Sequence, residues 1–478
     1  MDPRTTPSDS QRTRQRRYQY RAWPTAPQER ALGRLFGCVR FVQNTVIERR
    51  ENARMLGMPY PSTTELNQQI LVYGKQGAFA FLSEVSSVPL QQALRDVNTG
   101  YDRFFQWMKS GRKGRRAGAP KFRSRRGAQS ARFTKNAFTR GHLPVVTQPG
   151  SRHATVTLPK VGPVKFTLSR PLPAEPSSVT VIRRPSGRYE LSFVVTEPVP
   201  APAPRVHPGR VAGVDLGLTD LVAIVYSDGT RETVPAPKFL RLTEKRLRQA
   251  QQRLSRAQRG SRNREDARVR VARLHQKVSD QRRDFAAQLA SRLANENQVV
   301  VLESLSISGL VKGRSAKAVH DAGWGMLTSA IAAACEERGT TLIRAPRDFP
   351  STQLCAPCGR RDTPKPLHVR EWTCPGCGAR LDRDYNAATN LMILAGGHSA
   401  SPSIAQAMEL GTARGSKVRP HRHDPEMIRD LAAAQATTCT APRTRPTPRT
   451  RPLNRQARLN AWKSAMAQAR NDGTAPAD

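Results

Sequence analysis

The first hundred residues carry apolar side chains at three- and four-residue spacing, which is the spacing of one buried helix face. The first run of this kind consists of Leu32, Leu35, Val39, Val42 and Val46. Prolines at positions 59 and 61 break the pattern. A second run predicts a helix over 89–108 and consists of Leu90, Leu94, Val97, Tyr101, Phe104 and Phe105. We therefore expect a helical region from about residue 28, with the aromatic residues of the second run in the core rather than on a base-stacking surface.

Alternating polar and apolar residues predict strands in two other places. One short strand is expected over Arg17–Trp23, and several more over 153–196, with a hairpin turn at the sequence PSGR (185–188). The strands over 153–196 predict a small β domain. The following sequence, EPVPAPAPRVHPG, is proline-rich and stiff, so we place a linker at 201–208.

Beyond the linker, strands and helices alternate, as they do in an α/β domain. Strands are expected at VAGVDLG, LVAIVYSDGT, VVVLESL and TTLIRAP, a long basic helical hairpin over 239–297, and a helix at WGMLTSAIAAACEERG. These elements predict a domain over 209–397. Residues 398–478 are rich in Ala, Pro, Thr and Arg, and we expect a disordered tail there and a disordered basic tail over 1–16.

The net charge of the chain indicates which class of partner it binds. The 79 Lys and Arg residues and the 37 acidic residues give a net charge of +42 over 478 residues. Such an excess opposes compaction unless an anion neutralises it, and nucleic acid is the polyanion that fits best. The chain has no apolar run long enough to span a bilayer, no long basic amphipathic helix and no secretory leader. We expect a cytoplasmic, nucleoid-associated protein with no membrane partner.

Residues 109–133 are dense in Arg and Lys, are punctuated by Gly and carry two spaced Phe residues. A solvated loop is the simpler interpretation of this composition. Basic side chains interleaved with aromatic ones also suit single strands and irregular RNA, because cations meet the phosphates while the bases stack. The candidate nucleic-acid-binding residues are Lys121, Arg123, Arg125, Arg126 and Arg132.

Three acids stand in apolar surroundings that make a lone charge costly. Asp215 lies in VAGVDLG, Glu303 in VVVLESL, and Asp384 at the start of the expected helix DYNAATNLMILA. Each could have a structural role alone, for example as a helix cap. Together they predict a catalytic centre, because carboxylate oxygens bind Mg²⁺ and two such ions assist phosphodiester hydrolysis. Asp382 competes with Asp384 for this role; we prefer Asp384 because it leads directly into the helix.

The cysteines form two CxxC pairs, Cys355 with Cys358 and Cys374 with Cys377, separated by 15 residues. This is the spacing of a tetrahedral Cys₄ zinc site, and Gly359 and Gly378 suit the tight turns that follow each pair. A redox pair would show a single CxxC beside a βαβ unit. We predict structural Zn²⁺ in an insert over 350–380; catalytic zinc is disfavoured because no open position or general base is evident.

These motifs in combination resemble the TnpB family of transposon-encoded nucleases, related to type V CRISPR effectors. The resemblance runs from about residue 17 to 397 and rests on the segments around Asp215 and Glu303, the paired CxxC sequence, DRDYNAATN and the loop GAPKFRSRRGAQSARF. It implies a multidomain α+β fold with three domains. These are a RuvC/RNase H-like α/β nuclease domain with an inserted zinc ribbon, a β-barrel-like wedge domain over 17–27 and 129–200, and a helical recognition lobe over 28–128.

The resemblance also implies a function, namely RNA-guided cleavage of DNA, with a guide RNA and double- and single-stranded target DNA as partners. A compact type V CRISPR effector, an RNA-guided binder that does not cut, and a transposase that joins strands are the alternatives. Retention of Asp215, Glu303 and Asp384 favours cleavage over binding alone. The oligomeric state, the guide scaffold and the flanking DNA motif do not follow from the sequence.

Overall fold

The computed structural model describes residues 13–396, except 115, 139–142, 148–149, 200–205, 306–315 and 367. The tail predicted over 398–478, most of the predicted linker and residues 1–12 lie outside the described residues. Within the described part of the chain, no helix has both the length and the apolar character needed to cross a membrane.

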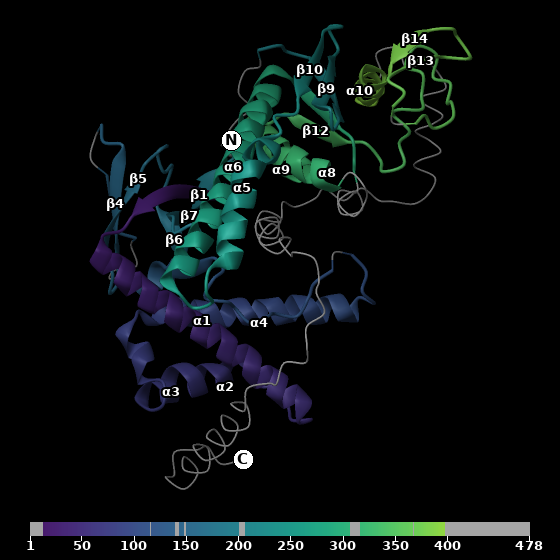
Figure 1. The fold of residues 1–478 in the computed structure, drawn as a ribbon. Coiled ribbons are helices and arrows are strands. Elements are labelled where there is room, and N and C mark those ends of the chain that lie inside the picture. The colour runs from purple at the N-terminus through teal and green to yellow at the C-terminus, as the bar shows by residue number, and fades with distance from the viewer. Residues whose placement is uncertain are drawn as a thin grey trace, which may run out of the picture. The chain divides into compact units, whose positions relative to one another are not determined.

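Two long helices, α1 (Ala26–Met55) and α4 (Ser87–Lys109), form the predicted helical region (Figure 1). Short helical segments connect them: α2 (Thr63–Asn67), the π-helix η1 (Gln68–Val72), α3 (Tyr73–Gln76) and the 3₁₀ segment η2 (Ala80–Glu84). The first predicted stripe is buried throughout, and the second is buried as far as Tyr101. Phe105 is 40 % exposed, so its prediction as core was wrong. Neighbouring residues point about 100° apart on a helix, so Phe104 and Phe105 cannot share one face.

A seven-stranded antiparallel sheet follows the order β2-β6-β7-β1-β5-β4-β3. Its strands are β1 (Thr13–Trp23), β2 (Gln129–Thr134), β3 (Val145–Thr147), β4 (His153–Leu158), β5 (Gly162–Thr167), β6 (Pro176–Arg183) and β7 (Tyr189–Pro198), with a 3₁₀ turn η3 (Lys135–Ala137). The strand predicted from Arg17 begins four residues earlier, so 13–16 are not part of a disordered tail. Arg14 and Arg16 both pair with the buried Glu197 on β7, which gives this basic segment a partner in the sheet.

One hydrophobic cluster joins this sheet to the helices. It contains apolar residues of α1 and α4 together with Phe133 of β2, Phe166 of β5 and Phe193 of β7. The three phenylalanines are fully buried. Because the helices and the strands share this core, they fold as one packed body, although the sequence places them in separate segments.

A second, five-stranded sheet has the order β10-β9-β8-β11-β12. Its strands are β8 (Val211–Leu216), β9 (Asp220–Tyr226), β10 (Arg231–Pro235), β11 (Val299–Leu302) and β12 (Thr341–Arg344). The first three are antiparallel neighbours, whereas β11 runs parallel to both β8 and β12. The sequence predicted four of these strands; β10 is additional.

Helices lie on both faces of the five-stranded sheet. The helices that the structure describes in this part of the chain are α5 (Phe239–Arg256) and α6 (Arg262–Glu296), which pack on each other, α8 (Ala316–Ala322), α9 (Trp324–Arg338) and α10 (Arg383–Ile393). Residues of α6 and α9 share a core with Val214 of β8, whereas α10 packs near Val301 of β11 on the other face. Helices α5 and α6 form the predicted basic hairpin (Figure 1). A small hairpin of β13 (Glu371–Thr373) and β14 (Arg380–Asp382) precedes α10.

Candidate active site and cysteine cluster

The parallel pairing of β8 and β11 brings Asp215 and Glu303 together. The register pairs Val214 with Leu302, so the next residue on each strand is one of the two acids. Both acids therefore reach the carboxyl end of the sheet at neighbouring positions. The backbone N–H of Leu216 donates a hydrogen bond of 2.9 Å to Glu303 Oε1, which fixes the glutamate against β8.

Helix α10 contributes the third acid because it packs against the backbone of β8 at Gly213. A Cβ atom at this position would lie 2.1 Å from the carbonyl oxygen of Ala388, so only glycine allows the approach. Strand residues two apart share a face, so Asp215 points to the same side as Gly213, toward α10. Asp384 lies in the first turn of that helix. The close packing thus carries Asp384 to the two strand acids.

The two neighbouring aspartates of α10 have different tasks. Asp382 is the N-cap residue, and its Oδ1 accepts hydrogen bonds from the N–H groups of Asp384 and Tyr385 at 3.0 and 2.8 Å. An N-cap carboxylate satisfies backbone donors that the helix cannot pair itself. Asp384 has no such role in the helix backbone. The geometry therefore agrees with the preference for Asp384 as the functional acid.

Sequence reasoning missed Arg370, which holds Asp384. Its Nη1 lies 2.8 and 3.2 Å from the two carboxylate oxygens of Asp384, and its Nη2 donates to Thr219 Oγ1 at 3.2 Å. Arg370 precedes β13 in the cysteine-containing insert, and Thr219 precedes β9. No local sequence signal distinguishes this arginine from the many others in the chain.

Burial makes negative charge unfavourable at all three acids. It raises the pKa of Asp215 well above its usual value, and the neighbouring charges of Glu303 and Asp384 raise it further. Burial raises the pKa of Glu303 to about 7, although the hydrogen bond from Leu216 opposes the shift. Burial also raises the pKa of Asp384, against the effect of Arg370. A cation bound here would relieve this repulsion.

Of the three acids, Asp215 has the surroundings that best suit a bound cation. It is only 7 % exposed, and it has neither a hydrogen bond nor an ion pair with any residue that the structure describes. A buried carboxylate without a partner is costly unless it is protonated or bound to a cation. The donor set of three carboxylates is the kind that Mg²⁺ prefers.

The four cysteines form the tightest metal-binding arrangement in the described residues. Their Sγ atoms all lie within 4.8 Å of one another, and no other group of three or more His, Cys, Asp or Glu side chains among these residues converges in the same way. The Sγ atoms of Cys355 and Cys377 lie 3.6 Å apart, and those of Cys358 and Cys374 lie 3.7 Å apart. The predicted set of four ligands is thus brought together.

Backbone geometry supports the cysteine cluster. Gly359 and Gly378, each just after a CxxC pair, have φ angles of 72° and 70°, the left-handed conformation that glycine adopts without strain. Burial raises the pKa of Cys374, but N–H groups of Cys377 and Gly376 outweigh this effect and lower the pKa to about 6. A thiol that ionises readily is a good metal ligand.

Two asparagines of α10 fasten the cysteine cluster to the helix of Asp384. Asn386 donates to the carbonyl oxygen of Leu354 at 2.6 Å and accepts from the N–H of Ala356 at 2.9 Å. Asn390 donates to the carbonyl oxygens of Leu354 and Ser351, both at 2.8 Å. Both asparagines are buried. The asparagines of the sequence DYNAATN therefore link the metal-binding insert to the candidate active site.

Comparison with known proteins places this arrangement in a family. Residues 192–314 match a family model described as "Probable transposase", and residues 324–391 match one described as "Cas12f1-like, TNB domain". A protein of Streptomyces pristinaespiralis named "Putative RNA-guided DNA endonuclease" is 39 % identical over 432 residues, which cover 89 % of this chain and 97 % of that protein. The chain belongs to the TnpB family. An Escherichia coli K12 relative, "Putative RNA-guided DNA endonuclease InsQ", is 27 % identical, with 87 % of this chain and 98 % of that protein covered.

Two further comparisons add little about this TnpB-family chain. A model described as "Helix-turn-helix domain" matches residues 14–55, but these residues form strand β1 and the single helix α1. The structure titled "Cryo-EM structure of the Cas12f1-sgRNA-target DNA complex" aligns at a TM-score of 0.48 with 12 % identity, covering 80 % of this chain and 99 % of that one. A score this low carries no weight for the fold.

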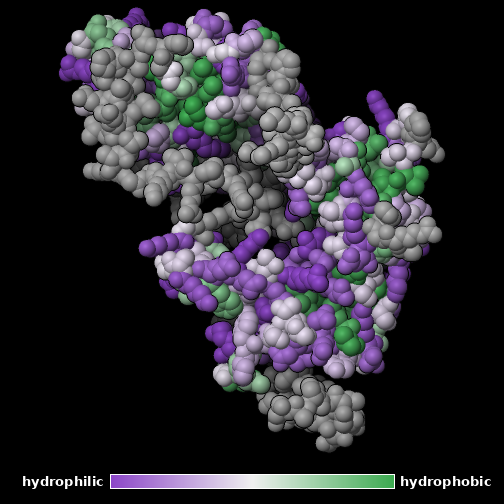
Figure 2. Space-filling view, turned by 180° about the vertical axis from the view of Figure 1, so that it is seen from behind, coloured by the Kyte–Doolittle hydropathy of each residue, from purple (hydrophilic) through white to green (hydrophobic). Residues whose placement is uncertain are grey.

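The candidate nucleic-acid-binding residues divide into two groups. Lys121, Arg123, Arg125 and Arg126 are exposed and form no ion pair with a described residue. Arg132, in contrast, donates to Asp96 at 2.7 Å and to Gln92 at 2.8 Å, both on α4. Hydrophilic side chains also dominate the face of the molecule in Figure 2, where hydrophobic residues appear in separate patches. The first four residues are therefore the ones available to a phosphate.

Proposed function

We propose that this protein is an RNA-guided DNA endonuclease that hydrolyses target DNA at a RuvC-type centre of Asp215, Glu303 and Asp384. One observation supports the proposal, namely that β8, the end of β11 and the start of α10 bring a buried Asp215 and the partly exposed Glu303 and Asp384 near one another at one edge of a sheet. The names of the Streptomyces and Escherichia coli relatives point to the same activity. The proposed nuclease domain spans 209–397.

The three acids would hold two Mg²⁺ ions, and the bound ions would supply the Lewis acidity that phosphodiester hydrolysis needs. The protein's own residues prepare this arrangement. Leu216 orients Glu303 through its backbone N–H, and Arg370 orients Asp384. The apolar surroundings of Asp215 shield its carboxylate from bulk water.

The cysteine cluster would hold one Zn²⁺ with a structural task. Four thiolates complete a tetrahedral zinc shell and leave no position for substrate. Through Asn386 and Asn390 the folded insert supports α10, and through Arg370 it supports Asp384. The zinc would thus contribute to cleavage by holding the active-site helix in place, at a distance from the chemistry.

The remaining residues would handle the nucleic acids. In this proposal the seven-stranded sheet forms a wedge domain, which the sequence placed at 17–27 and 129–200 and which β1 extends back to Thr13, and residues 28–128 form a recognition lobe. Lys121, Arg123, Arg125 and Arg126 would contact the guide RNA, whose folded shape and backbone proteins recognise with such residues. The guide supplies sequence specificity through base pairing.

The test is whether cleavage needs both RNA and metal. Full-length protein is purified, stripped of nucleic acid, and supplied with the RNA that originally co-purified with it. We expect DNA cutting only when this RNA and Mg²⁺ are both present, with free, unjoined product ends. Cutting without any RNA would make the protein an ordinary metal nuclease, and joined ends would make it a transposase.

A further inference from the structure

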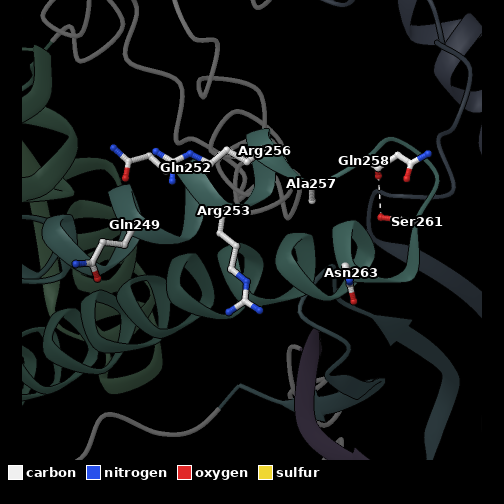
Figure 3. Close-up of a pocket in the computed structure, with 8 residues that line it drawn as sticks. All are labelled: Gln249, Gln252, Arg253, Arg256, Ala257, Gln258, Ser261 and Asn263. Carbon is white, nitrogen blue, oxygen red and sulfur yellow. Dashed lines mark hydrogen bonds between the residues drawn. The ribbon is translucent and has the colours of Figure 1, made fainter.

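The tip of the α5–α6 hairpin contains an open cleft that has no part in the carboxylate centre. The cleft has a volume of about 500 Å³. Figure 3 shows its lining on both helices and on the turn between them. Its polar members are Gln249, Gln252, Arg253, Arg256, Gln258, Ser261 and Asn263. An open cleft with amide and guanidinium groups suits a polar, anionic ligand better than an apolar one.

Two residues hold the cleft in shape before any ligand binds. Arg264 donates to the carbonyl oxygens of Leu254 and Ala257 at 2.8 and 2.7 Å, which satisfies acceptors at the carboxyl end of α5. Ser261 caps α6 by accepting from the N–H of Arg264, and it donates to the carbonyl oxygen of Gln258 (Figure 3). The tip is therefore preformed, and ligand binding would cost little ordering.

The other polar side chains that line the cleft have no side-chain hydrogen bond or ion pair with a residue that the structure describes. Arg253 and Arg256 are exposed, and neither forms an ion pair with a described residue. Elsewhere on the hairpin, Arg248 pairs with Glu244 and Arg268 pairs with Glu265. Arginines near the carboxyl end of a helix do stabilise its dipole. The helix dipole therefore explains why arginines occur at the end of α5. It does not explain why the cleft also contains amide side chains that form no hydrogen bond with these arginines.

The helical spacing of the cleft residues on α5 allows one ligand to contact several of their side chains. Positions 249, 252, 253 and 256 follow the i, i+3, i+4, i+7 pattern, which places them along one side of α5. Asn263 approaches from α6. Arginine binds phosphate with a fixed fork of donors, and amides can both donate to phosphate and accept from sugar hydroxyls. The donor set thus matches a sugar–phosphate backbone.

The basic loop of residues 121–126 lies near the start of α6. Arg125 and Arg126 lie close enough to Glu265, in the first turn of α6, for their charges to help lower its pKa, after the larger effect of Arg268. Asn44 of α1 anchors the loop by accepting from the N–H of Arg123 at 2.7 Å. The loop and the start of α6 therefore lie together, which makes the positive surface longer than the cleft alone.

We propose that the cleft at the hairpin tip binds the sugar–phosphate backbone of a nucleic acid strand, with Arg253 and Arg256 on the phosphates. The proposal rests on the function proposed above and deepens it, because it adds a binding site for the strand outside the carboxylate centre. Guide RNA and target DNA share this backbone chemistry, so the two sources are separated by experiment.

The experiment measures binding by fluorescence anisotropy to full-length, nucleic-acid-free protein. The probes are labelled single-stranded RNA, single-stranded DNA and an RNA–DNA heteroduplex, each of about 20 nucleotides. The test variant is Arg253→Ala with Arg256→Ala. The matched control is Lys245→Ala with Arg246→Ala, which removes the same charge from exposed, unpaired positions of the same helix. Thermal melting of each variant reports its fold.

We expect the test variant to bind at least one probe about tenfold more weakly than the control does, with a salt dependence smaller by about two phosphate contacts. Loss on RNA alone assigns the cleft to the guide, and loss on DNA alone to the target. Equal loss in both variants, or none in the test variant, overturns the proposal.

A second variant keeps the proposal testable if the alanine variant misfolds. Gln249→Glu with Gln252→Glu keeps the size of both side chains and should weaken the same probe by repulsion. Unchanged binding in this variant also overturns the proposal. Wild-type protein that binds the probes yet never cuts DNA would contradict the proposed function and leave the cleft intact.

Discussion

The cysteine cluster and the carboxylate centre both suit a cation, but the chain assembles them differently. The four cysteines lie between Cys355 and Cys377, and their sulfur atoms already converge within 4.8 Å. The three acids come from Asp215, Glu303 and Asp384, and they do not reach such convergence in the described structure. Local turns can form the first site, whereas the second depends on a sheet register and a helix packed on glycine. Changes in the cysteine cluster should therefore affect mainly local folding, and changes in the carboxylate centre should affect mainly cleavage.

The largest expected effect is the loss of cleavage when any of the three acids is removed. Asp215→Ala, Glu303→Ala and Asp384→Ala should each reduce the cutting rate by about a thousandfold or more, because the metal ions lose a ligand. Target binding should remain, since the acids do not hold the nucleic acid. Gel shifts and cutting assays on the same preparations measure both properties.

Asp382→Asn is the matched control, because an asparagine can still cap α10. It should cut at close to the normal rate. Normal cutting by the Asp384 variant, together with loss in Asp382→Ala, would show that the functional aspartate was assigned incorrectly.

Removing the zinc should disturb the fold of the insert before it affects chemistry. Elemental analysis should give close to one zinc per chain, and Cys374→Ser should lower this content and expose the insert to proteolysis, because metal binding supplies its folding free energy. Cleavage should fall as a consequence, through Asn386 and Arg370. Cys439→Ser, which lies outside the two CxxC pairs in the sequence, should retain the zinc. Zinc-free wild-type protein with unchanged melting would contradict this prediction.

The dependence of stability on pH is a further way to distinguish the carboxylate centre from the thiol cluster. Glu303 has a pKa raised by burial from 4.5 to about 7, so the native state holds its proton more tightly than the unfolded chain. The stability of chelator-treated protein should therefore fall as pH rises from about 4.5 through about 7. Protons also compete with Mg²⁺, so the apparent Mg²⁺ affinity should increase over the same range.

The check is to melt chelated wild-type protein and Glu303→Gln between pH 5 and pH 8, values that bracket a pKa of about 7. The variant should show a smaller pH-dependent decline, because its residue 303 cannot ionise, whereas Asp215, whose pKa is also raised by burial, still can. An identical decline in both proteins would mean that Glu303 is not the titrating group.

The smallest effect is expected at the contact that joins the two sites. Arg370→Ala should raise the pKa of Asp384, because the arginine lowers it now. The rate of cleavage should fall by about tenfold at neutral pH and recover at higher pH. Arg370→Lys should recover part of the loss. The control Arg380→Ala removes a more exposed arginine, paired with Glu371 in the same insert. A uniform loss at every pH would indicate a structural role only.

The sequence predicted those parts of the fold whose signals are local. Cys355 to Cys377 were identified from their spacing, and Asp215 from its position in an apolar strand. Arg370 and the close approach at Gly213 were not identified, because both depend on how distant segments meet. The start of β1 was missed because Arg14 and Arg16 resemble a tail until Glu197 is placed beside them.

The most direct test of RNA guidance is to change the guide and follow the cut. Nucleic-acid-free protein is loaded with RNAs that share one scaffold and differ in their guide ends, and each complex is given DNA that contains all the matching targets. The account predicts that the cut moves with the guide and disappears in the Asp215→Ala variant. A cut that stays in one place whichever guide is supplied would contradict RNA guidance.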